Sequence, residues 1–121
     1  MARACVRGQD PPSQVLEDAA AAFVMLSSPV RLHMVWALAQ QDSDVSQLAL
    51  RVGSTPQAIS QHLAKLRLAG IVRVRREGRN RVYSLANHSL QAAATLMIER
   101  FTPSVSNPRP EALPASRTPS T

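Results

Sequence analysis

The chain of 121 residues is long enough for one domain but not for several. Its 14 lysine and arginine residues outnumber the 8 acidic ones, for a net charge of +6, and eight of the basic residues lie within 51–81 beside a single acid; a patch so confined indicates a polyanionic partner. The single cysteine excludes an intrachain disulfide, and with it a disulfide-stabilised secreted scaffold. Because the longest apolar run, residues 19–26, is too short to span a bilayer and no signal-peptide pattern is visible, we expect a cytoplasmic protein.

The two ends of the chain differ in composition from its middle. Residues 1–13 contain few large apolar side chains, and residues 102–121 contain five prolines among serine, threonine, asparagine and arginine. Such compositions do not bury enough apolar surface to offset the entropy lost on ordering. We therefore expect a flexible tail at each end of one folded domain over residues 14–101. This part is short for a self-contained core, which favours a dimer that shares apolar surface.

Helical periodicity dominates the start of the expected domain. The spacing of apolar residues predicts a helix over 14–26, with Ser13 as a candidate N-cap. Ser28 followed by Pro29 marks the start of a second helix, because proline at the first helical position sacrifices no hydrogen bond. The expected buried stripe of this second helix consists of Leu32, Val35, Trp36 and Ala39.

A third, shorter helix is expected after a break at residues 42–44. It covers residues 47–52, with Asp44 or Ser46 as its cap and Gly53 at its end.

The fourth expected helix carries the most informative pattern. Thr55 caps it, Pro56 opens it and it ends at Gly70. At 100° per residue its faces separate cleanly. One face is apolar and suited to packing on the preceding helices: Ile59, Leu63 and Leu66. The opposite face is uncharged to basic: Gln57, Gln61 and Lys65, flanked by Ser60 and His62.

An arginine-rich hairpin follows, with strands expected over 71–76 and 81–85 and a turn at residues 77–80. Valines and arginines alternate in the first strand, which gives one buried and one solvated face. Tyr83 and Leu85 are expected to anchor the hairpin to the core. Asn87 then caps a last helix, whose apolar face consists of Leu90, Ala93, Ala94, Met97 and Phe101.

A helix, a tight turn, a polar helix and a basic hairpin in this order are typical of a winged helix-turn-helix, which places one helix in the major groove of DNA. The fold class is therefore mainly α with a small β-hairpin, in the order α-α-α-α-β-β-α, and dimeric. Glutamine can form two hydrogen bonds with the edge of an adenine, and arginine can bind a phosphate group. The predicted DNA-binding residues are Thr55, Gln57, Ser60, Gln61, His62, Lys65, Arg73, Arg75, Arg76, Arg79 and Arg81.

Each of these features has a simpler interpretation when it is considered alone. Glutamine, serine and lysine are ordinary residues of a solvated helix, and charge on an exposed hairpin prevents aggregation. An enzyme is not expected, because the acidic residues are scattered and the chain lacks a Gly-rich phosphate loop. The alternative that stays open is a winged-helix protein-interaction module that does not bind DNA.

Several motifs in the chain follow one another in a recognisable order. They are Leu26-Ser27-Ser28-Pro29-Val30-Arg31-Leu32, Leu48-Ala49, Val52-Gly53, Ser60-Gln61-His62-Leu63, Ala69-Gly70-Ile71-Val72, Gly78-Arg79 and Tyr83-Ser84-Leu85. Over residues 15–100 this series resembles the ArsR/SmtB family of small bacterial winged-helix repressors. The resemblance implies a homodimer that binds an imperfect palindrome over a promoter and is released by an effector. The dimer interface is expected to contain Leu16, Phe23, Leu90, Ala93, Met97 and Phe101.

The metal sites that the resemblance implies are not matched by this sequence. The family's third-helix thiolate site would need cysteines near Asp44 and Ser46. The positions that match its last-helix site hold Asn87, Ser89, Arg100 and Pro103, of which the arginine brings positive charge. We therefore expect no metal and no cofactor at these places. The effector stays open among a metal at a non-standard site, oxidation of Cys5, a small molecule and none.

Overall fold

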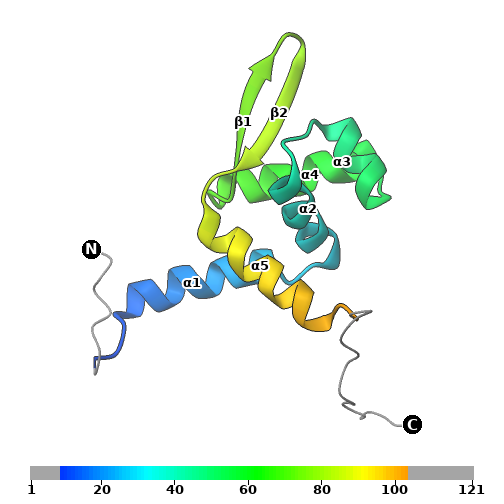
Figure 1. Ribbon diagram of the computed structural model, residues 1–121. Helices are drawn as coiled ribbons and strands as arrows, with labels where there is room; N and C mark the ends of the chain where they lie inside the picture. The colour runs from blue at the N-terminus through cyan, green and yellow to red at the C-terminus, as the bar shows by residue number, and fades with distance from the viewer. Residues whose placement is uncertain (1–8, 104–121) are drawn as a thin grey trace.

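The structure is a computed structural model that describes residues 9–103 (Figure 1). It confirms the predicted order of four helices, a two-stranded antiparallel hairpin and a fifth helix. The predicted tails at 1–13 and 102–121, and Cys5 with them, lie outside the described residues except for 9–13 and 102–103. The elements are α1 (Ser13–Met25), α2 (Pro29–Gln40), α3 (Val45–Val52), α4 (Pro56–Leu68), β1 (Val72–Glu77), β2 (Asn80–Leu85) and α5 (His88–Phe101).

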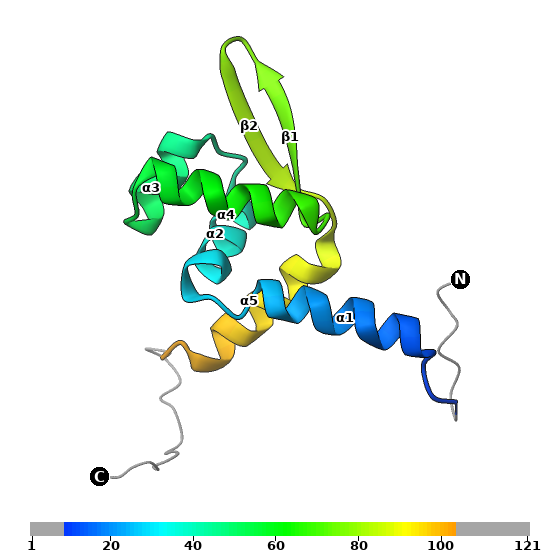
Figure 2. The same cartoon turned by 180° about the vertical axis from the view of Figure 1, so that it is seen from behind.

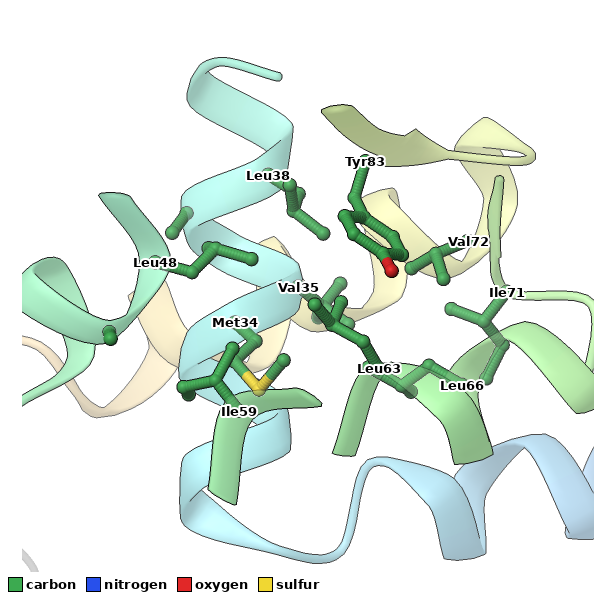
Figure 3. Close-up of a cluster of buried hydrophobic side chains, with 13 residues drawn as sticks. Met34, Val35, Leu38, Leu48, Ile59, Leu63, Leu66, Ile71, Val72 and Tyr83 are labelled. Atoms are coloured by element: carbon green, nitrogen blue, oxygen red, sulfur yellow. The ribbon is translucent and has the colours of Figure 1, made fainter. Parts of the chain in front are cut away.

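Helix α2 lies at the centre of the core, where α3, α5 and β2 pack around it. Figure 3 shows its side chains converging with those of α4 and the hairpin. Of the stripe predicted from the sequence, Val35 is fully buried, Leu32 and Trp36 pack against the core while partly buried, and Ala39 is only half-buried. A helix with neighbours on several sides has no single buried stripe, so burial extends around it to Met34, Val35, Ala37 and Leu38.

Side-chain caps determine where most of the helices begin. Helix α3 begins at Val45, two residues before the predicted start, because Asp44 and Gln47 form a reciprocal capping box. The backbone N–H of each donates to the side-chain oxygen of the other at 2.9 Å. The predicted caps Ser28, Thr55 and Asn87 are confirmed, each accepting a backbone hydrogen bond three residues on.

Helix α1 differs from the others in its cap and its burial. It begins at Ser13 with Pro12 at the N-cap position and no side-chain cap, so the prediction of Ser13 as N-cap is wrong. None of its residues is buried, and it extends away from the body of the molecule (Figure 1, Figure 2). Among residues 9–103 no single helix is long and apolar enough to cross a membrane; only α1 and α2 taken together, at 95° to each other, have that length and composition.

The hairpin β1–β2, which we call the wing, is longer than the sequence predicts. Pairing continues to Glu77 and Asn80, so the loop has two residues instead of four. Gly78, at φ +64°, supplies the left-handed conformation that so short a loop demands. The predicted anchor Tyr83 is confirmed: its side chain is buried, and its backbone exchanges two hydrogen bonds with Ser43, at 2.8 and 3.1 Å.

Candidate nucleic-acid interface

Helix α4 separates an apolar and a polar face as predicted. Ile59, Leu63 and Leu66 are at most 1% exposed and pack against α2 (Figure 3). The residues predicted to contact DNA on the other side of the helix and at its start are all exposed: Thr55, Gln57, Ser60, Gln61 and Lys65. An exposed face that carries hydrogen-bonding groups and one positive charge, without any acid, suits the edges of base pairs.

The wing presents arginines to solvent along its length. Figure 2 shows α4 passing beneath the base of the wing, so that helix and hairpin are neighbours. The arginines predicted to contact DNA are all exposed: Arg73, Arg75, Arg76, Arg79 and Arg81. Guanidinium groups in this arrangement can bind backbone phosphates or enter a narrow minor groove.

Arg75 differs from the other wing arginines because two carboxylates neutralise it. Its guanidinium donates to Asp42 and to Glu77, each at 2.8 Å. These hydrogen bonds, first that to Asp42, raise the pKa of Arg75. Asp42 lies 33 residues away in the loop before α3, so no local pattern in the wing could have indicated this ion pair. Arg75 therefore joins the wing to the body of the protein and contributes little net charge to the surface.

His62 lies at the edge of the polar face and is partly buried. Its Nδ1 is 3.5 Å from the Nη1 of Arg31 at the start of α2, while the Nε of Arg31 donates to the Met25 carbonyl at 2.7 Å. Burial, followed by the charges of Arg31 and Lys65, lowers the pKa of His62 below its ordinary value of 6.5. Arg31 thus links His62 on α4 to the end of α1, and the lowered pKa favours the neutral imidazole.

The replacement Arg31→Met is expected to raise the pKa of His62 partway toward 6.5, since one of the two nearby charges is removed while burial remains. The pKa of His62 is lower in the folded protein than in the unfolded chain, where it is about 6.5. Its contribution to the free energy of unfolding is therefore fully present above about pH 6.5, and it is lost as the pH falls through the pKa of the folded state. An NMR titration of the imidazole measures the midpoint. Arg31→Lys, which keeps the charge, is the control. A wild-type midpoint at or above 6.5 would contradict the assignment.

Arg67 is a basic residue of this surface that the sequence-based prediction missed. It lies on the same edge of α4 as Ser60, seven positions earlier, and this helical spacing was the available signal. In the structure Arg67 lines a hollow of about 180 Å³ between α4 and the wing, together with Val74, Arg75, Arg76 and Arg81.

The predicted dimer residues are only partly accessible. Leu16 and Phe23 on α1, and Met97 and Phe101 on α5, are between 51% and 64% exposed. Leu90 and Ala93 are half-buried, and Leu90 packs against the core of the same chain.

The described residues contain no group of three histidine, cysteine, aspartate or glutamate side chains that could hold a metal ion. At the positions that match the family's last-helix site, Asn87 caps α5, and the guanidinium of Arg100 lies over the ring of Phe101, 5.4 Å from its centroid.

Comparison with known proteins places this geometry in a family. The model of the bacterial regulatory proteins of the arsR family matches residues 28–74, from the cap of α2 into β1. The HTH-type transcriptional regulator KmtR of Mycobacterium tuberculosis is 42% identical over 69 residues, which are 57% of this chain and 53% of KmtR. This chain therefore matches about half the length of KmtR. The nodulation protein NolR of Rhizobium meliloti is 35% identical over 82 residues, 65% of this chain and 67% of NolR.

Solved structures agree with the sequence matches. The transcriptional repressor BigR from Xylella fastidiosa superposes with a TM-score of 0.70 at 27% identity, covering 75% of this chain and 93% of BigR. A homodimeric winged helix-turn-helix DNA-binding domain from Mycobacterium bovis superposes with a TM-score of 0.66 at 26% identity, covering 78% of this chain and 89% of that domain. These likenesses confirm the winged helix-turn-helix fold. The chain belongs to the ArsR/SmtB family of bacterial regulatory proteins.

Proposed function

We propose that this protein is a sequence-specific DNA-binding transcriptional regulator, a repressor of the ArsR type that binds a palindromic operator as a homodimer. The observation that carries the proposal is the exposed, acid-free polar face of α4 directly beside a wing rich in arginine. The proposal assigns no catalytic activity. It places the protein with the chromosome, in the cytoplasm.

The division of work between helix and wing follows from side-chain chemistry. Gln57 and Gln61 point from exposed positions of α4 and carry amides, which form two hydrogen bonds with an adenine edge. Arg79 lies in the loop at the tip of the wing and carries a charge that acts on any phosphate whatever the sequence. Helix α4 is therefore assigned to base recognition and the wing to the backbone.

A homodimer is supported by the apolar surface that one chain leaves uncovered. Large hydrophobic side chains are exposed on both α1 and α5, and α1 has no buried residue. A two-fold interface there would cover this surface and would hold two α4 helices about one turn of DNA apart. The homodimeric relative from Mycobacterium bovis supports the same assembly.

The proposal is tested by a mobility shift of the purified protein on random and on selected duplex DNA. Binding carried by phosphate contacts is expected to weaken by about 10³-fold or more between about 50 and about 200 mM salt. Selection of a palindrome from a random library would support the operator. Failure to bind any duplex at low salt would overturn the proposal in favour of a protein-interaction module.

The replacements Gln61→Ala and Arg79→Ala are expected to act differently on binding. The first should remove discrimination at particular base pairs, by about 1–3 kcal/mol for a good base contact. The second should weaken binding to all sequences alike and lower the salt dependence, because it removes a phosphate contact. Fluorescence anisotropy on the selected site and on single-base variants of it separates the two effects. The reverse assignment would refute the division between helix and wing.

A further inference from the structure

The hollow between α4 and the wing brings together basic side chains from distant parts of the chain. Arg67 comes from the last turn of α4, Arg76 from β1 and Arg81 from β2. Val74, half-buried, forms part of the lining. The hollow has a volume of about 180 Å³ and opens to solvent.

The pairing of the two strands brings two of these arginines side by side. Arg76 and Arg81 are directly opposite each other in the antiparallel register. Their side chains lie on the same face of the hairpin as those of Val74 and Tyr83, the opposed pair two positions along. Like charges directly opposite each other destabilise a strand pair. A negative group bound between the two side chains would offset such a like-charge pair.

No carboxylate of the described residues supplies that negative group. The ion pairs found between residues 9 and 103 both involve Arg75, whose charge Asp42 and Glu77 already balance. Arg67, Arg76 and Arg81 form none within this range. Of the four arginines that line the hollow, Arg75 is thus paired with carboxylates, and Arg67, Arg76 and Arg81 are not.

We propose that Arg67, Arg76 and Arg81 form a cradle for one phosphate group of the DNA backbone. The inference rests on the proposed function and deepens it. Guanidinium forks bind phosphate oxygens through paired, charge-assisted hydrogen bonds, and a bound phosphate would relieve the repulsion between Arg76 and Arg81. It would also connect α4 to the wing at the surface that faces DNA. In this arrangement Arg75 is a positioning residue, which holds the wing to the loop before α3.

The test compares salt dependence for single and combined variants, measured by anisotropy on duplex DNA. The triple variant Arg67→Gln, Arg76→Gln, Arg81→Gln is expected to lower the slope of log affinity against log salt by about 0.9, the value for one phosphate. Three separate contacts would lower it by about 2.7, three times that value. Arg100→Gln on α5, which removes the same charge outside the cradle, is the control with the wild-type slope.

A second measurement asks whether the cradle binds phosphate without DNA. Inorganic phosphate is titrated into the free protein while NMR follows the arginine Nε–H signals. Saturable shifts are expected at Arg67, Arg76 and Arg81, while the Nε–H signal of Arg100, outside the hollow, should not move. Phosphate shifts of equal size at all four arginines would overturn the cradle. Thermal unfolding checks that the triple variant still folds. Because Arg76→Gln or Arg81→Gln removes one of two like charges, the melting temperature is expected to stay unchanged or to rise.

The outcomes separate this inference from the proposed function. If the wild-type protein binds duplex DNA and the triple variant keeps the wild-type slope of log affinity against log salt, the cradle is overturned and DNA binding stands. The same holds if that slope falls by about 2.7. Wild-type protein that binds no duplex but shows the phosphate shifts overturns DNA binding and assigns the hollow to a free anion. Neither duplex binding nor phosphate shifts overturns both.

Discussion

Replacing Leu66 by alanine is expected to lower the free energy of unfolding by about 2–5 kcal/mol. Leu66 has no exposed surface and lies on the core face of α4, among Leu63 and Ile71 (Figure 3). Removing three side-chain carbons, the Cγ methine and its two methyl groups, loses their transfer free energy and leaves a cavity that the packed core closes only in part. Urea unfolding at matched protein concentrations measures the change.

The control for Leu66→Ala is two positions further along the same helix. Leu68 is 90% exposed, so Leu68→Ala is expected to change the free energy of unfolding by no more than about 0.5 kcal/mol. The two substitutions remove the same atoms from the same type of residue in one helix. Equal losses of stability in both variants would contradict the orientation of α4, and with it the exposure of its polar face.

Introducing a carboxylate into the proposed dimer interface is expected to have the second large effect. Phe23→Glu combined with Met97→Glu should convert the protein to a monomer, because a charge buried against apolar surface without a partner costs several kcal/mol. Both residues are more than half exposed in one chain, so the substitutions leave the core of that chain intact. Binding to a palindromic operator should fall by at least about 100-fold, since a monomer loses the linkage between half-sites.

Sedimentation at micromolar concentration reads the assembly directly, and Leu50→Glu serves as the control. Leu50 is 85% exposed on α3, away from α1 and α5, so a charge there is expected to leave the dimer intact. Circular dichroism of each variant verifies the fold. A monomeric wild-type chain would contradict the proposed dimer. A monomeric Leu50→Glu variant beside a dimeric Phe23→Glu, Met97→Glu variant would show that the interface lies elsewhere.

Some predictions made from the sequence failed for identifiable physical reasons. The sequence predicts Ser13 as the cap of α1, but Pro12 occupies the cap position and no side chain caps the helix. The loop of the wing was expected to have four residues, while cross-strand pairing continues to Glu77 and Asn80. Both errors concern the ends of elements, where pairing and capping compete over one or two residues.

The burial of α2 could not be read from its own periodicity. Trp36 and Leu32 fit an apolar stripe, but the helix is surrounded by α3, α5 and β2, and its most buried residues include Met34 and Ala37. In contrast, the stripe Ile59, Leu63 and Leu66 was correct, because α4 has one side against the core and one side toward solvent. Periodicity reports burial only where a helix has a single covered face.

The sequence by itself determined the order of the elements, most of the helix starts and the polar face of α4. Those features depend on neighbours within one or two turns of the chain: a capping serine, threonine or asparagine, a proline at a first helical position, and the 100° step between helical residues. Such signals act over distances that a linear pattern contains, and they need no knowledge of what packs against them.

The tertiary structure alone decided which charges on that surface are free and which are balanced. Arg75 is paired with Asp42, 33 residues earlier, as well as with the nearby Glu77. The charge of Arg31, 31 residues before His62, helps to lower the pKa of that histidine. The grouping of Arg67 with Arg76 and Arg81 likewise depends on how the base of the wing lies beside the end of α4. Electrostatic interactions act through space over a few ångströms, so they are determined by the packing of distant segments and not by spacing along the chain.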